Sequence, residues 1–152
     1  AIATYFIENM ERDTLYILGT GSTVKTILKV LEKPYTLLGI DALYNGEIVG
    51  LDLNEREILK LIEKYANSKK KLVLTPIGGQ GFILGRGNQQ LSSKVVERIG
   101  IDNIIVLATR SKVRSLKCLH VDTGDPALDN KFKNRYIRVI VDYNEEFVMK
   151  IC

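Results

Sequence analysis

Residues 19–23, GTGST, are one of two glycine-rich segments whose residue types suit phosphate binding. Glycine lets the backbone approach a ligand and adopt positive φ, and the hydroxyls that follow can donate hydrogen bonds. If a helix starts here, its first N–H groups have no intrahelical partner and lie at the positive end of the dipole. An ordinary strand–turn–helix with a Ser or Thr N-cap would explain the same pattern. The candidate ligand-binding residues are Gly19, Thr20, Gly21, Ser22 and Thr23.

The second segment, GGQGFILGRGNQQ at 78–90, holds five of the chain's 12 glycines. The apolar triplet at 82–84 favours burial and therefore indicates more than a flexible linker. An arginine can clamp a phosphate through two hydrogen bonds, and the amides can bind ring edges or hydroxyls. Long loops in compact domains are often functional, although a glycine-rich packing loop is the alternative. We expect ligand contacts from Gly78, Gly79, Gln80, Gly81, Arg86, Gly87, Asn88, Gln89 and Gln90.

Carboxylates at two further places could assist chemistry. VDTGD at 121–125 offers Asp122, Thr123 and Asp125, although Asp125 precedes a proline and could simply cap a helix. Asp41 lies near a strand end, where it could be a base, an acceptor for ribose hydroxyls or a turn carboxylate. We name Asp41 and Asp122 as catalytic candidates, and Thr123 and Asp125 as ligand-binding candidates.

The sulfur and imidazole side chains predict no metal site. Only two cysteines occur, Cys118 and Cys152, which is no disulfide framework and is typical of a reducing cytosol. With one histidine, His120, and no CxxC pair, a zinc site is not expected. We expect Cys118 to be buried and inert and His120 to be a core residue.

Hydrophobic patterning predicts the elements that position these residues. Apolar runs indicate strands at 15–18, 36–43, 47–51, 72–77, 104–108, 119–122, 137–141 and 147–151. Periodic segments and caps indicate helices at 2–11, from GTGST to about 33, from 54, from 92 or 93 to 99, at 112–117 and at 126–131. Asn54 with Glu57 forms a variant of the capping box, and Asn45-Gly46 is a strong hairpin signal.

Strands that alternate with helices and are continuously apolar predict an α/β fold with a mostly parallel sheet. We expect one domain over 1–152 in three Rossmann-like layers, with helices on both faces and antiparallel hairpins at 36–52 and 137–151. Ligands of open α/β sheets bind beyond the carboxyl ends of the strands. The two glycine-rich segments and VDTGD should therefore meet at one edge of the sheet.

Composition disfavours nucleic-acid and membrane partners, and the glycine-rich segments indicate a small phosphorylated ligand. The net charge is +4, but the basic residues are scattered along the sequence, which disfavours nucleic-acid binding. The longest basic run, 69–71, is expected at a helix end, where cations complement the helix dipole. No apolar run approaches the roughly 18 residues that a membrane span needs, and no signal peptide is evident. We expect a cytoplasmic protein with no membrane partner, and leave a homo-oligomer open.

A family resemblance extends from about Leu15 to Val141. LYILGTGSTVKTIL, TLLGIDAL, TPIGGQGFILGRGNQQLS, DNIIVLAT and VDTGDPALD resemble the C-terminal part of ATP-NAD kinase-like proteins, a group that includes AcoX-like sequences. The resemblance implies a parent that makes NADP by transferring phosphate from ATP or polyphosphate to the 2′-hydroxyl of NAD. It implies NAD or ATP as ligands, and Mg²⁺ in the parent enzyme. The superfamily's catalytic GGDG motif belongs to an N-terminal domain, which we expect upstream of Ala1, and Gln80 of GGQG cannot replace its aspartate.

A second resemblance leaves two other functions open. A strand followed by GTGST is similar to ribose-5-phosphate isomerases and glucosamine-phosphate deaminases, whose loop holds a sugar phosphate. A sugar-phosphate isomerase or deaminase is therefore one alternative to the kinase-like domain. A non-catalytic regulatory or oligomerisation module is the other.

Overall fold

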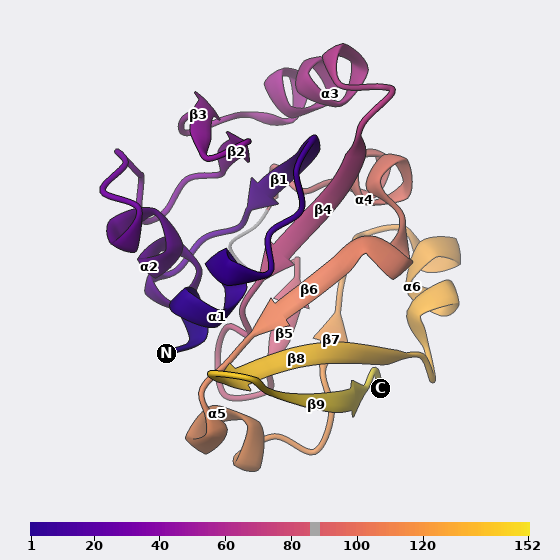
Figure 1. Cartoon of the computed structure of the whole chain (residues 1–152). Coiled ribbons are helices and arrows are strands. Elements are labelled where there is room, and N and C mark those ends of the chain that lie inside the picture. Colours follow the sequence, from indigo (N-terminus) through magenta and orange to yellow (C-terminus); the bar gives the residue numbers. More distant parts are fainter. Residues whose placement is uncertain (86–88) are drawn as a thin grey trace.

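Four parallel strands form the centre of a seven-stranded sheet in the computed structural model, which describes residues 1–85 and 89–152. The strand order is β3-β2-β1-β4-β6-β8-β9, with antiparallel strands only at the two sides (Figure 1). The strands are β1 (Thr14–Leu18), β2 (Asp41–Tyr44), β3 (Glu47–Gly50), β4 (Lys69–Leu74), β6 (Ile104–Leu107), β8 (Tyr136–Asp142) and β9 (Glu145–Lys150). The expected α/β class with a mostly parallel sheet is confirmed.

Helices cover both faces of this sheet and complete three layers. One hydrophobic core joins the sheet to α1 (Ile2–Glu8) and α2 (Ser22–Val30). A larger core joins the opposite face to the remaining elements. These elements are α3 (Glu55–Lys64), α4 (Ser93–Ile99), the 3-10 helix η1 (Ile101–Asn103), α5 (Arg110–Arg114), α6 (Pro126–Phe132) and a small parallel sheet of β5 (Phe82–Leu84) and β7 (His120–Val121).

The continuously apolar strands follow from these two cores. Successive side chains of a strand point to opposite faces, so a strand covered on both sides needs apolar residues throughout. In β1, Tyr16 and Leu18 pack towards α1 and α2, whereas Leu15 and Ile17 pack into the larger core. All five residues of β1 are buried.

Local signals of the sequence are confirmed at one hairpin turn and at one helix start. Asn45 and Gly46 both have positive φ, at 49° and 78°, as the predicted hairpin between β2 and β3 requires. Asn54 and Glu57 form the predicted capping box at the start of α3, with both hydrogen bonds present.

Three expectations from the sequence differ from the structure. The strand expected at 36–43 starts only at Asp41, because the carboxylate of Asp41 binds the amide and hydroxyl of Thr36 and folds the preceding loop back. The glycine-rich segment contains strand β5, which pairs with β7 rather than with the main sheet. The basic run at 69–71 begins strand β4 instead of ending a helix.

Within the described residues, no helix has the length and apolar character needed to cross a membrane.

Candidate functional site

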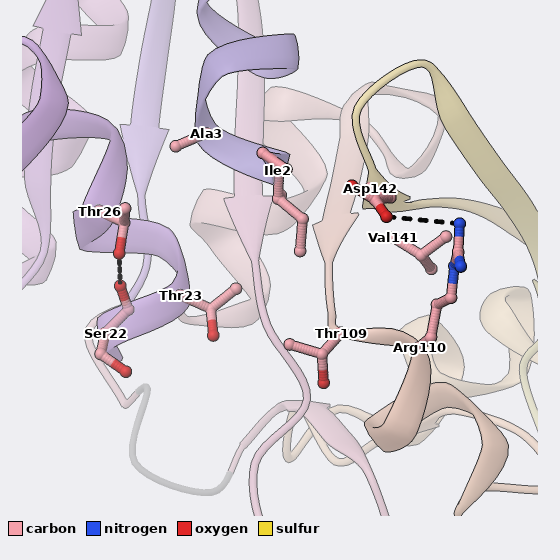
Figure 2. Close-up of a pocket in the computed structure, with 10 residues that line it drawn as sticks. Ile2, Ala3, Ser22, Thr23, Thr26, Thr109, Arg110, Val141 and Asp142 are labelled. Carbon is pink, nitrogen blue, oxygen red and sulfur yellow. Dashed lines mark hydrogen bonds and ion pairs between the residues drawn. The ribbon is translucent and has the colours of Figure 1, made fainter.

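A pocket of about 470 Å³ lies where β1, β6 and β8 end (Figure 2). This is the carboxyl edge of the parallel sheet, where ligands of open α/β folds bind. The pocket is lined by three neighbouring residues at the start of the chain, by the N-terminal ends of α2 and α5, and by the last residues of β8. The lining residues are Ala1, Ile2, Ala3, Ser22, Thr23, Thr26, Thr109, Arg110, Val141 and Asp142.

The first wall of this pocket is the N-terminus of α2. Gly21 precedes the helix with φ 105° and ψ 153°, and no side chain caps the first turn. A Cβ at Gly21 would lie 3.1 Å from Cγ2 of Thr75, so glycine meets both a backbone and a packing requirement here. The first N–H groups of α2 lack intrahelical acceptors and carry the positive end of its dipole. Ser22 is exposed at this wall and Thr23 half-buried.

The opposite wall combines a hydroxyl with an ion-paired arginine. The guanidinium of Arg110 lies 3.3 Å from Asp142 and also contacts Glu145. Thr109 caps α5 by accepting a hydrogen bond from the amide of Lys112 at 3.3 Å. Sequence reasoning missed Thr109 and Arg110, although polar residues directly after the buried strand β6 were an available signal.

The glycine-rich segment borders a second pocket, of about 280 Å³. Gly79 and Gln80 line this second pocket together with Cys118 and His120. Neither Gly79 nor Gln80 lines the pocket at α2. Lys112 donates a hydrogen bond to the carbonyl of Gly78 at 2.8 Å. The predicted contacts Arg86, Gly87 and Asn88 lie outside the described residues. Gln89 is exposed, and the buried Oε1 of Gln90 accepts no hydrogen bond from any described residue.

The VDTGD turn lies directly against the end of β5. The amide of Asp122 donates to the carbonyl of Leu84 at 3.1 Å, and a Cβ on Gly85 would lie 2.2 Å from the carbonyl oxygen of Asp122. The side chain of Asp125 accepts hydrogen bonds from the amides of Ala127 and Leu128 and so caps α6, as the alternative to ligand binding predicted.

Thr123 also binds within this turn. Its hydroxyl and its amide both donate to the carboxylate of Asp129. Neither Thr123 nor Asp125 lines the two pockets described above. The geometry therefore favours a role in shaping the turn over the predicted ligand contacts.

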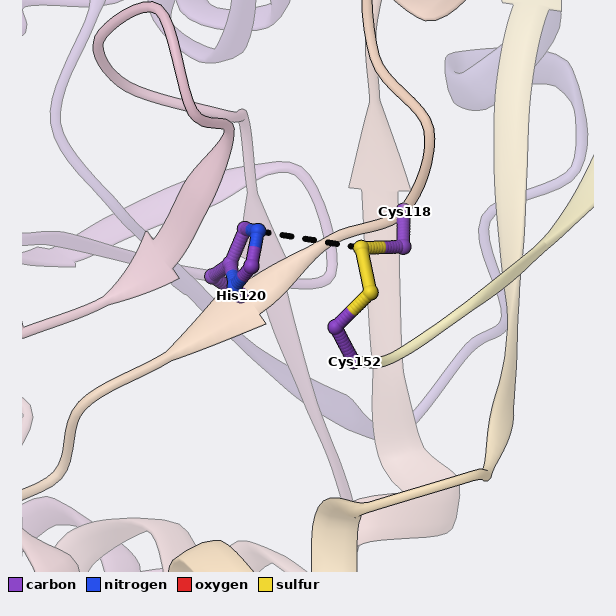
Figure 3. Close-up of side chains that lie close together, drawn as sticks. All are labelled: Cys118, His120 and Cys152. Atoms are coloured by element: carbon purple, nitrogen blue, oxygen red, sulfur yellow. Dashed lines mark hydrogen bonds between the residues drawn. A yellow bond between two sulfur atoms is a disulfide. The ribbon is translucent and has the colours of Figure 1, made fainter.

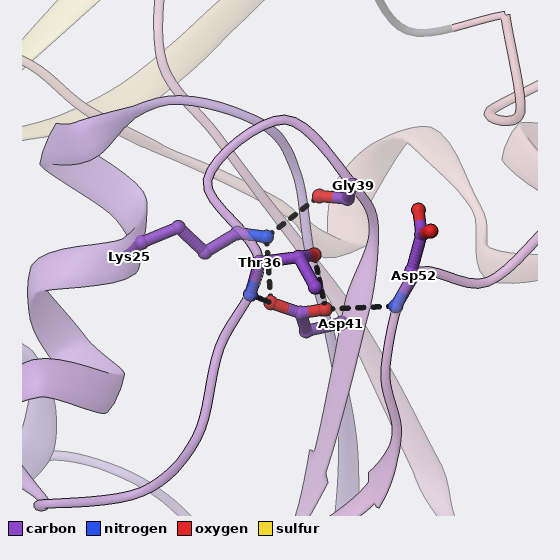
Figure 4. Close-up of polar contacts among 5 residues, drawn as sticks. All are labelled: Lys25, Thr36, Gly39, Asp41 and Asp52. Carbon is purple, nitrogen blue, oxygen red and sulfur yellow. Dashed lines mark hydrogen bonds and ion pairs between the residues drawn. The ribbon is translucent and has the colours of Figure 1, made fainter.

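Asp41 is buried in an ion pair with Lys25 (Figure 4). The ammonium of Lys25 lies 2.9 Å from Oδ2 of Asp41 and donates to the carbonyl of Gly39 at 2.6 Å. The two side chains are 1% and 0% exposed. An enclosed carboxylate with these partners fits a structural role better than the catalytic role considered for Asp41. The helical pattern could have revealed Lys25, since it lies three residues before the buried Leu28.

The electrostatics of this pair reflect burial and hydrogen bonding. Burial alone raises the pKa of Asp41, but the amides of Thr36 and Asp52 and the ammonium of Lys25 outweigh it, and the pKa lies below its usual value. Burial also lowers the pKa of Lys25, and Asp41 opposes that shift. Contacts within the protein therefore favour the charged form of Asp41, and the contact with Asp41 favours the charged form of Lys25 against burial.

The two cysteines form a disulfide beside His120 (Figure 3). The sequence indicated no disulfide framework and a buried, inert Cys118. Cys118 is buried as expected, but it is bonded to Cys152, because the fold brings together residues 34 positions apart. His120 is half-buried, stacks on Phe82 at 5.2 Å between ring centroids, and lies with Nε2 3.7 Å from the Cys118 sulfur.

Comparison with known protein families matches residues 11–151 to the model of the ATP-NAD kinase C-terminal domain. The chain belongs to this family. No curated protein and no solved structure matches it.

For an ATP-NAD kinase C-terminal domain, the pocket at α2 offers hydroxyls, first-turn amides and a guanidinium, which suit a phosphorylated ligand. Mg²⁺ is usually held by one or two carboxylates together with substrate phosphates, and the described lining of this pocket has no unpaired carboxylate for it. Asp142 is the one carboxylate lining the pocket, and it is paired with Arg110. Across residues 1–85 and 89–152, the one group of three clustered metal-ligating side chains is Cys118, His120 and Cys152.

Proposed function

We propose that the chain is the ligand-binding C-terminal domain of an ATP-NAD kinase-like protein, and that its pocket at the N-terminus of α2 binds a phosphate group of a nucleotide. Family membership supports the parent activity, phosphorylation of NAD to NADP with ATP or polyphosphate. The observation that carries the proposal is the open first turn of α2, which faces the pocket with Ser22 and Thr23.

The chemistry of the pocket matches this role. A phosphate at the helix end would accept hydrogen bonds from the first-turn amides and from the hydroxyl of Ser22. Arg110 on the opposite wall is 43% exposed and can turn part of its donor fork towards the ligand while still paired. In this role the chain binds and orients a substrate, and the amide of Gln80 offers no base for the transfer.

The test measures thermal stability of the chain with NAD, ATP, a pentose phosphate and an amino-sugar phosphate. A ligand present at about 100 times its dissociation constant adds about 2.7 kcal/mol of stability, which raises the melting temperature measurably. We expect stabilisation by NAD or ATP and no kinase turnover by the isolated chain.

The decisive variant is Ser22→Asp, with Ser93→Asp as its matched control. Each serine is the first residue of its helix, α2 or α4, and an aspartate there complements the helix dipole, so both variants should fold. At α2 the new charge repels a phosphate, and the nucleotide-dependent shift should disappear in Ser22→Asp alone.

Three outcomes would contradict the proposal. Equal ligand shifts in both variants would place the phosphate elsewhere. A response to sugar phosphates but not to nucleotides would favour the isomerase or deaminase alternative, and no response to any ligand would favour a regulatory module.

A further inference from the structure

Two sulfur side chains and one imidazole, all of which can bind metal ions, converge at the edge of the second pocket (Figure 3). Cys118 precedes β7, His120 begins β7, and Cys152 follows β9. The two sulfurs and a ring nitrogen of His120 all lie within 4.8 Å of one another. Sequence spacing gave no sign of this cluster, because Cys152 joins it only through the fold.

The backbone holds these residues together independently of the S–S bond. The amide of Leu119 donates to the carbonyl of Lys150, and the amide of Cys152 donates to the carbonyl of Leu119. These hydrogen bonds fix the two cysteine Cα atoms next to each other, 5.8 Å apart. The thiols would therefore stay adjacent after reduction.

The histidine is held in place as well. Its amide donates to the carbonyl of Gly81 at 3.0 Å, and its ring stacks on Phe82. A ligand whose ring is fixed before the metal arrives loses little conformational freedom on binding. Cys118 is 7% exposed, whereas Cys152 is exposed and gives access from solvent.

The separation between the histidine and Cys118 fits a tetrahedral ion. With metal–sulfur and metal–nitrogen bonds of about 2.3 and 2.0–2.1 Å, ligand sulfur and nitrogen atoms lie roughly 3.6 Å apart. Nε2 of His120 lies 3.7 Å from the sulfur of Cys118. Thiolate and imidazole ligands select Zn²⁺-like ions over Mg²⁺ or Ca²⁺, which prefer oxygen.

We propose that Cys118, His120 and Cys152 form a binding site for Zn²⁺ in the dithiol state, and that the disulfide is the state that excludes the ion. A phosphine supplies the two electrons that cleave the S–S bond and becomes the phosphine oxide by taking oxygen from water, whose two protons complete the thiols; a dithiol reductant instead becomes its own disulfide and supplies both protons. The ion then binds both sulfurs as thiolates and displaces those protons, and one coordination position remains for water. The disulfide form has no thiolate to offer.

The test titrates the full chain with Co²⁺, a spectroscopic substitute for Zn²⁺, after reduction with a phosphine. We expect one equivalent to bind with thiolate-to-cobalt charge transfer and the visible bands of tetrahedral cobalt, and Zn²⁺ to displace it. The disulfide form should show neither signal. Ser115→Ala, which changes another residue of the same pocket, is the matched control and should bind as the parent chain does.

Three variants test the ligand set: Cys118→Ser, Cys152→Ser and His120→Asn. Each should weaken binding by at least about tenfold, since losing even an outer contact of a metal ligand costs 10- to 100-fold. His120→Asn keeps the disulfide, and Cys152 is exposed, so these two variants decide the question if Cys118→Ser does not fold. The proposal is overturned if the reduced chain binds no Co²⁺, or if any of these three ligand variants folds and binds Co²⁺ as tightly as the parent chain.

Discussion

Asp41 shows how one buried carboxylate organises the loop between α2 and β2. It accepts hydrogen bonds from Lys25, from the amide and hydroxyl of Thr36, and from the amide of Asp52. Gly39 lies in the same loop, where a Cβ would be 2.5 Å from oxygens of both Thr36 and Asp52. The conformation of the loop therefore depends on the charge of Asp41 and on the absence of a side chain at Gly39.

Asp41→Asn should destabilise the domain strongly. The substitution keeps the shape of the side chain but leaves the ammonium of Lys25 buried without its counter-charge. Removing one partner of a buried ion pair costs about 3 to 5 kcal/mol, which chemical denaturation would measure. Glu47→Gln breaks the exposed pair with Lys33, where the glutamate is 74% exposed, and should change stability by less than about 1 kcal/mol. Similar losses in both variants would contradict the structural role of Asp41.

The carboxylate of Asp41 should also make the free energy of unfolding depend on pH in the acid range. Since the pKa of Asp41 is lowered in the folded state, its stabilising contribution is complete above the unfolded value of about 3.9 and is lost as pH falls through the folded value. Unfolding free energies measured from pH 6 to pH 2 should fall less steeply in Asp41→Asn than in the parent chain. Part of the slope should remain, because Arg138 lowers the pKa of Glu146 as well. An unchanged slope would show that Asp41 does not have a lowered pKa.

At the scale of elements, the small sheet of β5 and β7 aligns the glycine-rich segment with the VDTGD turn. Gly85 has φ 103°, and a Cβ there would lie 2.2 Å from the carbonyl oxygen of Asp122. No side chain can fit this contact without moving one of the two strands. The junction between the two segments therefore requires glycine.

Gly85→Ala should consequently cost about 1 to 3 kcal/mol or more, from the positive φ and the backbone clash together. Gly79→Ala is the matched control, because a Cβ there meets nothing within 4 Å and its φ is not in the positive region. It should be neutral or raise stability by up to about 1 kcal/mol by restricting the unfolded chain. Thermal unfolding of both variants gives the comparison, and equal melting temperatures would mean that the close approach at Gly85 does not constrain the fold.

At the scale of the whole molecule, the sequence predicts what local patterns can encode. The apolar runs at β1, β4 and β6, the Asn45-Gly46 turn and the capping box at Asn54 are all set by neighbouring residues, and all are confirmed. Lys25 pairs with Asp41, and Cys118 with Cys152, through tertiary contacts that no local sequence pattern encodes. For the same reason the sequence indicated Ser22 and Thr23 as ligand residues but not Arg110, which meets them only across the sheet edge.

The layered core also predicts how stability is distributed across the sheet. Strands β1, β4 and β6 have neighbours on both sides and helices on one or both faces, so their amides should exchange only when the domain unfolds globally. Strand β3 pairs on one side only, and none of its four residues is fully buried. Native-state hydrogen exchange should therefore show the slowest amides in β1, β4 and β6 and much faster exchange in β3. Protection of β3 equal to that of β1 would indicate that a partner or a second copy of the chain covers this edge in solution.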